Sequence, residues 1–304
     1  MMAFFLAIDG GGTKTRCRVA DETCVLAESA GETVKIMSVG EAVATERLQA
    51  LVRKVVEGSG VYPEQIERTC IGLAGSSSEQ VRTWAHRTLR GLVSGEILVV
   101  GDEEIALDAA FQGDPGILVI AGTGSNVIGR CSGGTSVTAG GWGPLLGDEG
   151  SGYWIGLEAL RAGLRAHDRN VDTCMLREIM AFWKLHDLSE LVAKGNHRPH
   201  PNFAELTKIV ANCASGGDAL AVSLLERAGE ELAAQVLLVI SKMKAEGCVP
   251  SDLVQVAFTG SVLGEISIVR QYMEANLRAA LPEVVIAQTP VEPLDGALWR
   301  ARRG

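Results

Sequence analysis

The stretch Asp9-Gly10-Gly11-Gly12-Thr13-Lys14-Thr15 decides how the chain begins to fold. The apolar run Phe4–Ile8 leads into it and residues 16–20 lead out, which predicts two strands joined by a glycine turn. Because glycines place no side chain over the backbone, their N–H groups can point at an anion. The stretch therefore predicts a phosphate-binding turn, with the Thr13 and Thr15 hydroxyls as further donors. A glycine-rich hairpin without a ligand is the alternative.

Two charged residues belong to this first turn. Asp9 ends the predicted strand, where a carboxylate can hold a magnesium ion through water. Lys14 can contact a phosphate, or it can be a solvated hairpin lysine.

A second turn of the same kind follows a break at Gly113–Gly116. The run Ile117–Ile120 leads into Gly122-Thr123-Gly124, and Asn126–Gly129 leads out. Strand, glycine turn and strand thus recur roughly 110 residues later, which predicts an internal repeat and a second phosphate-binding turn. A third glycine turn, Thr259–Val262, contains Gly260 and Ser261 and can pack on the adenosine of a nucleotide.

Size and composition narrow the class of protein. The 304 residues suggest two domains, and a net charge of -9 with no basic stripe argues against a nucleic acid partner. The apolar run Val236–Ile240 is far too short to span a bilayer, so we expect no membrane insertion. The seven cysteines form no CxxC pair, which predicts reduced, mostly buried thiols in a cytoplasmic protein.

The pattern of apolar residues predicts an α/β fold. Strands are expected at residues 70–75, 97–102, 254–258 and 284–287, and residues 31–40 are expected to form a loop. Helices are expected at 41–58, 151–167 and 293–303, with further helices dominating residues 171–246.

Asp102 is the candidate general base. It follows a buried run, Ile97–Gly101, and ligands usually bind at the carboxyl ends of strands in open α/β sheets. The alternative is that Asp102 caps the next helix, or that Asp102, Glu103 and Glu104 are its solvated first turn.

The glycine-rich loop 140–152 is the other candidate site. Asp148 and Glu149 in it either cap the next helix or face a ligand, and the surrounding glycines favour a ligand. Asn126 can orient a sugar hydroxyl or be a turn residue. Trp142 can form a wall on which a sugar stacks, although a core position is the commoner one for tryptophan.

These motifs, in this order over nearly the whole chain, resemble the family of N-acetylglucosamine kinases and BadF/BadG/BcrA/BcrD ATPases. That family is part of the actin, sugar-kinase and heat-shock-chaperone superfamily. The most specific stretches are Gly140–Gly143 and Gly147–Gly156, which are typical of the hexosamine-kinase branch.

The resemblance implies two ribonuclease-H-like domains around a nucleotide and sugar cleft. The first is residues 1–115, joined by the helix 293–304, and the second is residues 116–292. It implies an ATP- and Mg²⁺-dependent kinase whose base, Asp102, deprotonates the 6-hydroxyl of a hexosamine or related hexose. A homodimer is common among similar proteins.

The resemblance also assigns residues to the two ligands. The residues expected to bind the nucleotide are Gly10, Gly11, Gly12, Thr13, Lys14, Gly122, Thr123, Gly124, Gly260 and Ser261. Those expected to bind the sugar are Lys35, Gly75, Asp102, Ser125, Asn126, Gly141, Trp142, Gly143 and Asp148.

Two departures from the family pattern bear on function. Sugar kinases of the family carry an asparagine in the loop after the third strand, where this chain has Lys35, a cation suited to an acidic or altered substrate. The family's dehydratase activators hold an iron–sulfur cluster through cysteines near the second phosphate turn. Here Ala121 and Ser125 occupy that turn and Cys131 stands alone, which argues against an activator ATPase.

Three rival functions remain: the activator ATPase, an ATP-binding protein without kinase activity, and a sugar sensor. Sensors with this fold carry a DNA-binding helix-turn-helix before the first strand. This chain begins its first strand near residue 3, which argues against a sensor of that kind.

Overall fold

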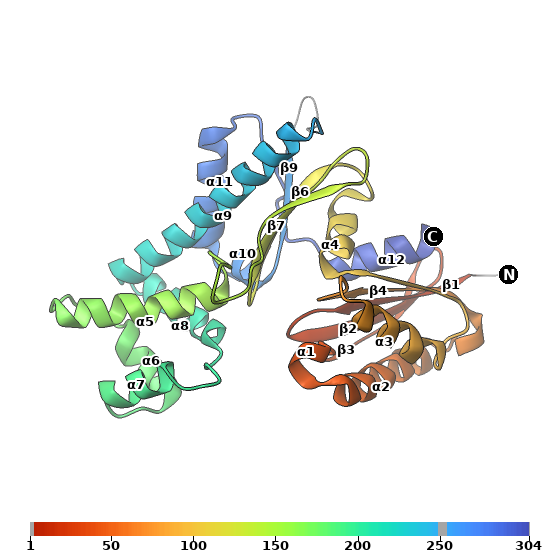
Figure 1. Cartoon of the computed structure of the whole chain (residues 1–304), viewed down its shortest axis with the longest axis horizontal. Helices are drawn as coiled ribbons and strands as arrows, with labels where there is room; N and C mark the ends of the chain where they lie inside the picture. The colour runs from red at the N-terminus through yellow and green to blue at the C-terminus, as the bar shows by residue number, and fades with distance from the viewer. Residues whose placement is uncertain (1–2, 249–253, 304) are drawn as a thin grey trace. The chain divides into compact units, whose positions relative to one another are not determined.

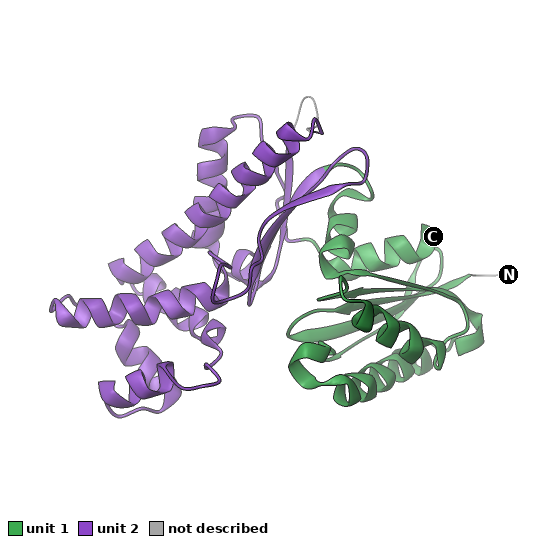
Figure 2. Ribbon diagram, viewed as in Figure 1, with its two compact units in different colours: residues 1–115, 291–304 green, residues 116–290 purple. Residues whose placement is uncertain are grey.

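The computed structural model describes residues 3–248 and 254–303. It divides into two compact units, residues 1–115 with 291–304 (unit 1) and residues 116–290 (unit 2), shown in Figure 2. Each unit is built around one five-stranded sheet (Figure 1). No helix among the described residues is long and apolar enough to cross a membrane.

Unit 1 has the strand order β3-β2-β1-β4-β5, with β1, β4 and β5 parallel and β2 and β3 antiparallel to their neighbours. Its elements are β1 (Phe4–Gly10), β2 (Lys14–Ala20), β3 (Val25–Glu32), α1 (Ile36–Val39), α2 (Glu41–Ser59), η1 (Pro63–Gln65), β4 (Ile66–Leu73), α3 (Glu79–Arg90), β5 (Glu96–Gly101), α4 (Asp102–Phe111) and α12 (Pro293–Arg303).

The central strand β1 is buried on both faces because it alternates between two apolar cores. Leu6 and Ile8 belong to the core formed with α2 and α3. Phe5 and Ala7 belong to the core formed with α4 and α12. Helices therefore cover both faces of this sheet, which explains why β1 is a continuous apolar run rather than an alternating one.

Unit 2 has the strand order β10-β9-β6-β7-β8 and a larger set of helices. Its elements are β6 (Gly116–Ala121), β7 (Ser125–Arg130), β8 (Ser136–Gly140), α5 (Gly152–Asp168), α6 (Met175–Trp183), α7 (Leu188–Gly195), η2 (Phe203–Leu206), α8 (Thr207–Ser215), α9 (Ala219–Ala245), β9 (Gln255–Thr259), α10 (Ser261–Glu265), α11 (Ser267–Ala280) and β10 (Val285–Ile286).

The two sheets have the same topology. Numbered within each unit, both read 3-2-1-4-5, with the first two connections antiparallel hairpins and the fourth and fifth strands parallel to the first. The predicted α/β fold with ribonuclease-H-like units is confirmed, and the internal repeat extends beyond the turns to whole sheets.

Three local expectations were wrong. Residues 31–40 are not a plain loop, because β3 continues to Glu32 and α1 forms one helical turn. Strand β8 was not expected, because only two of its five residues, Val137 and Ala139, are buried, which is too short an alternation to indicate a strand. Cys131 does not stand alone: it forms a disulfide with Cys248, so not all seven cysteines are reduced in this structure.

Candidate functional site

The first glycine turn lies open at the end of β1. A Cβ added to Gly12 would meet no described atom within 4 Å, and one on Gly11 would come no closer than 3.4 Å to any. Gly10 differs, because a Cβ there would lie 2.4 Å from the Leu73 side chain of β4. Packing against β4 therefore requires glycine at position 10, whereas Gly11 and Gly12 leave room for a ligand.

The hydroxyl and amine side chains of this turn divide into two groups. Thr13 and Lys14 are exposed at the turn. Thr15 is fully buried, and its hydroxyl accepts a hydrogen bond from the Val34 N–H at 3.1 Å. The expectation that Thr15 offers a donor to the turn was wrong, because its side chain is buried and binds the Val34 N–H instead.

Asp9 is a buried carboxylate paired with a cation. Its Oδ2 accepts from Arg16 Nη2 at 2.9 Å, and Arg16 also binds Glu292 in the segment before α12. Its Oδ1 lies 3.8 Å from where a Gly11 Cβ would stand, so that oxygen faces the turn. Burial raises the pKa of Asp9, and the Arg16 guanidinium opposes that rise. One oxygen facing the open turn fits a role in holding a magnesium ion.

Asp102 is the first residue of α4, directly after β5. Gly10, Leu73 and Gly101 are paired in register across β1, β4 and β5, so Asp102 emerges at the same edge of the sheet as the first glycine turn. Burial raises the pKa of Asp102 to about 7, and the neighbouring carboxylates of Glu103 and Asp9 add to the rise. A carboxylate with such a pKa suits general base catalysis near neutral pH.

Helix capping does not account for Asp102. Gly101 is the N-cap of α4, and its N–H donates to Glu104 Oε1 at 3.1 Å. Glu104 also pairs with Arg300 of α12, which binds Asp108 at 2.6 Å. Because Glu104 caps the helix, the Asp102 carboxylate is available for another role.

Lys35 and Gly75 lie at the same edge of unit 1. The Thr33 hydroxyl donates to the Gly11 carbonyl at 2.9 Å and accepts from the Lys35 N–H, which joins Lys35 to the first turn. Gly75 follows β4 with φ +82°, and the neighbouring Ala74 N–H donates to the Gly10 carbonyl. The structure thus gathers the unit 1 candidates at one edge of its sheet.

The second glycine turn, in unit 2, is tightly packed. A Cβ on Gly260 would lie 2.2 Å from the Ala121 carbonyl oxygen, and its φ is +98°. The N–H groups of Gly152 and Tyr153, in the first turn of α5, donate to the carbonyls of Gly122 and Thr123. Three segments distant in sequence therefore meet at residues 121–124.

Asp148 fixes the glycine-rich loop against this turn. Its Oδ1 accepts from the Gly143 N–H at 3.0 Å, and its Oδ2 lies 2.8 Å from where a Gly124 Cβ would stand. It is buried and has a positive φ of 60°. Ser151, not Asp148, caps α5 by accepting from the Trp154 N–H. The capping alternative for Asp148 is therefore wrong.

Ser125 and Asn126 begin β7 beside that loop and differ in their bonding. The Ser125 hydroxyl donates to the Glu149 carbonyl at 2.8 Å, so its proton is committed to holding the loop. Asn126 packs on Gly141, and its buried Oδ1 accepts no hydrogen bond from any described residue. An unsatisfied buried acceptor is the group that a substrate hydroxyl would pair with.

Trp142 is 75% exposed, so it is not a core tryptophan. The glycines on either side, Gly141 and Gly143, have φ of +71° and +90°. Glycine is the residue that adopts such left-handed conformations without strain, and the exposed indole beside them is available to a ligand.

A cavity of about 400 Å³ opens beside the second turn within unit 2. Its lining includes Gly122, Thr123, Lys208, Ser261 and Ile266. That volume lies in the range of small-ligand pockets. Gly122, Thr123 and Ser261, three of the residues predicted to bind the nucleotide, line this cavity.

The chain matches the model of one protein family over residues 6–299, by the description "BadF/BadG/BcrA/BcrD ATPase family". The chain belongs to the BadF/BadG/BcrA/BcrD ATPase family. The resemblance found in its glycine motifs is confirmed.

Proteins similar to this chain match it over nearly its whole length. An N-acetylmuramic acid/N-acetylglucosamine kinase of Clostridium acetobutylicum is 30% identical over 99% of both chains. An N-acetyl-D-glucosamine kinase of Dictyostelium discoideum is 29% identical over 96% of both. A solved structure from Chromobacterium violaceum, proposed to be an N-acetylglucosamine kinase, is 26% identical, covers 98% of each chain and gives a TM-score of 0.75.

Sequence reasoning missed two parts of the site in this family member. The first is Arg16, the partner of Asp9, which lies on the return strand β2. The sequence did hold a signal for it, because residues seven apart can stand directly opposite each other in a hairpin, as Asp9 and Arg16 do. The cavity residues on η2 and α8, such as Lys208, carry no local signal, since they reach the second turn only through the packing of helices.

Proposed function

We propose that the protein is an ATP-dependent hexosamine kinase, which transfers the γ-phosphoryl group of ATP to a sugar hydroxyl, the 6-hydroxyl in the leading case. The observation that carries the proposal is Asp102: a half-buried carboxylate with a pKa of about 7 at the sheet edge that also holds Asp9 and the open glycine turn. The kinase names of the two curated relatives, which match nearly the whole chain, support it.

The proposal gives each group of residues one task. Gly11, Gly12 and Thr13 in unit 1, and Gly122–Gly124 in unit 2, bind the phosphates through backbone N–H groups. The cavity beside Gly260 and Ser261 binds the nucleoside. Asn126 Oδ1 accepts from a sugar hydroxyl, Asp148 holds the loop that carries Trp142, and Trp142 stacks on the sugar.

Asp9 is the residue that would hold Mg²⁺, through the oxygen that faces the turn. Bound there, the metal would supply neutralising charge to the phosphates. Asp102 accepts the proton of the attacking hydroxyl, whose oxygen forms the new bond to phosphorus as the bond to the ADP oxygen breaks. Arg16 donates to the Asp9 carboxylate and opposes the rise in its pKa that burial causes.

A coupled ADP-release assay over a sugar panel tests the kinase proposal. The panel is glucosamine, N-acetylglucosamine, N-acetylmannosamine, N-acetylmuramic acid, glucose and an acidic hexose. We expect ADP release that depends on one sugar far above the others and disappears in Asp102→Asn. ADP release that no sugar alters would contradict the kinase proposal and favour an ATPase. Iron analysis of protein purified without oxygen would then test whether that ATPase is a dehydratase activator.

Lys35 bears on which sugar of the panel is the preferred substrate. We propose that its ammonium favours a sugar bearing a carboxylate, because it lies at the sheet edge beside the first turn. N-acetylmuramic acid carries such a group, and the Clostridium relative is named for it. Lys35→Met should lower kcat/KM for N-acetylmuramic acid about 10-fold, the effect of about 1.4 kcal/mol, and leave N-acetylglucosamine within about 2-fold. Equal losses for both sugars would remove Lys35 from specificity.

A cytoplasmic location and a homodimer remain predictions. Light scattering of the purified chain tests the dimer directly, and fractionation of the source cells tests the location.

A further inference from the structure

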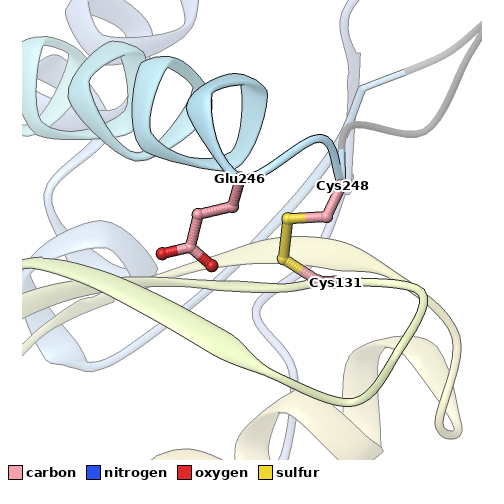
Figure 3. Close-up of side chains that lie close together, drawn as sticks. All are labelled: Cys131, Glu246 and Cys248. Carbon is pink, nitrogen blue, oxygen red and sulfur yellow. A yellow bond between two sulfur atoms is a disulfide. The ribbon is translucent and has the colours of Figure 1, made fainter.

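Three metal-binding side chains meet in unit 2, in a part of the fold with no role in the proposed kinase. Figure 3 shows Cys131, at the end of β7, beside Glu246 and Cys248, which follow α9. One ligand atom from each lies within 4.8 Å of the other two. Cys131 and Cys248 are 117 residues apart in sequence and 5.2 Å apart at Cα. Among the described residues, this is the one group of three such side chains.

Backbone hydrogen bonds hold both sides of the group. Cys131 opens a tight turn, donating its N–H to the Thr135 carbonyl and accepting from the Gly134 N–H. On the other side, Gly247 has φ +69° and the Cys248 N–H donates back to the Met243 carbonyl. The left-handed glycine reverses the chain at the end of α9, so Cys248 and Glu246 are directed to the same point. The positions of the three Cα atoms are therefore fixed by the fold.

The donor set selects a class of metal. Two sulfur ligands and one carboxylate oxygen are ligands of zinc, whose sites often hold three protein groups and a water. Magnesium and calcium prefer oxygen alone, so the two sulfurs disfavour them. The group also stands at the C-terminal end of the 27-residue helix α9, where the helix dipole favours a cation.

We propose that Cys131, Glu246 and Cys248 form a binding site for a zinc-class divalent cation in the reduced protein, and that the disulfide is the metal-free, oxidised state of the same site. Binding releases two thiol protons as two metal–sulfur bonds form. Oxidation by a low-molecular-weight disulfide releases the metal. The two cysteine sulfurs then form one bond and lose two electrons, which break the sulfur–sulfur bond of the oxidant; with two protons from solvent the oxidant becomes two thiols.

The two states need different sulfur positions but the same backbone. Two thiolates on one tetrahedral zinc lie about 3.8 Å apart, which rotation of the cysteine side chains can reach while the Cα atoms stay in place. Cys131 is buried, Cys248 is half-buried and Glu246 is exposed, so the third ligand can swing in from solvent. Metal and disulfide are therefore alternatives on one scaffold.

The test is a Co²⁺ and Zn²⁺ titration of the full chain, reduced with a phosphine and handled without oxygen. We expect about one Co²⁺ per chain, with sulfur-to-cobalt absorption in the near ultraviolet that one equivalent of Zn²⁺ abolishes. Cys131→Ser and Cys248→Ser should each lose this absorption, and Glu246→Gln should weaken Co²⁺ binding about 10-fold or more. Protein oxidised with a disulfide reagent should bind no cobalt until it is reduced again.

The matched control is the Cys174→Ser/Cys213→Ser double variant, because these two thiols lie against each other elsewhere in unit 2. Burial raises the pKa of Cys213 to about 12, which disfavours its thiolate, so this variant should bind cobalt as the wild type does. No cobalt binding by the reduced wild type would overturn the proposal and leave a structural disulfide. Binding that survives in Cys131→Ser/Cys248→Ser would also overturn it, because the metal would then lie on other residues.

Thermal melts of every variant accompany the titration. A serine variant that melts as the reduced wild type does, yet binds no cobalt, supports the site. If both serine variants unfold, Glu246→Gln decides: unchanged cobalt affinity and spectrum in that folded variant would remove the three-residue site.

Discussion

The two glycine turns occupy the same place in two sheets of the same topology, yet different neighbours support them. The turn after β1 lies open, and a Cβ on Gly12 would meet nothing described within 4 Å. The turn after β6 is packed against Gly260, the start of α5 and the Asp148 carboxylate. A repeated motif therefore predicts a repeated shape, whereas its surroundings decide whether a glycine is needed for packing or for a ligand.

The carboxylates beside the two turns also differ. At the open edge of unit 1, Asp9 is buried and Asp102 is half-buried, and the pKa of each carboxylate is raised. In unit 2, the Asp148 carboxylate accepts a backbone N–H and fixes a loop. The carboxylates with raised pKa values thus lie in unit 1, whereas the Asp148 carboxylate of unit 2 has a structural contact within its loop.

The largest expected effect tests the reacting group. Asp102→Asn should lower kcat by about 10²- to 10⁴-fold, the usual contribution of a general base, with Mg-ATP analogue affinity nearly unchanged. Stopped or coupled ADP assays give the first value, and calorimetric titration gives the second.

The matched control for this change is Glu104→Gln. The glutamine oxygen can still accept from the Gly101 N–H, and the lost pairing with the partly exposed Arg300 should cost about 1 kcal/mol or less of stability. If Glu104→Gln loses as much activity as Asp102→Asn, general charge at the start of α4 matters rather than the base.

The next effect sets the two turns against each other. Gly260→Ala should lower the free energy of unfolding by about 3 kcal/mol or more, because its Cβ would strike the Ala121 carbonyl and its φ is positive. Gly12→Ala should change that free energy by no more than about 0.5 kcal/mol. Urea unfolding of both variants measures the difference.

Binding of an ATP analogue tests the role of the first glycine turn. Gly12→Ala should lose most of the thermal stabilisation by the analogue although its stability is unchanged. Full retention of that stabilisation would mean that the open turn does not receive the phosphates.

The last comparison concerns how stability depends on pH. Because folding raises the pKa of Asp102 from an ordinary value of 3.8 to about 7, the unfolded chain releases this proton first as pH rises. Wild-type stability relative to Asp102→Asn should therefore fall between about pH 4 and 7 and then level off. Asp102→Asn should equal the wild type near pH 4 and exceed it at pH 7.5, as measured by urea unfolding at each pH. A constant difference across this range would contradict the raised pKa.

Features that depend on residues close together in the sequence could be predicted. Apolar runs ending in glycine placed β1, β6 and the two turns, and Leu48, Leu51, Val52 and Val55 correctly marked the buried face of α2. The break near Gly116 marks the point where the second sheet begins.

Features that depend on distant residues could not be predicted. The Cys131–Cys248 contact joins residues 117 apart, and no spacing rule reports such a pair. Strand β8 escaped detection because only Val137 and Ala139 mark its buried face. The exposure of Trp142 depends on the left-handed glycines beside it, a property of backbone rather than of composition.

The helix α12 has a consequence for how unit 1 is made. It packs on β1 and α4, and its Gly296 approaches the Ile105 carbonyl so closely that a Cβ there would lie 1.8 Å from the oxygen. All of unit 2 is synthesised between α4 and α12. At about 5–20 residues per second, the helix bearing Asp102 waits on the order of ten seconds or more on the ribosome for the partner that covers it. During that interval Ala7, Cys70 and Ile105 lack the apolar cover that α12 gives them. Until α12 is made, chaperones and proteases can therefore reach the face of unit 1 that α12 later covers.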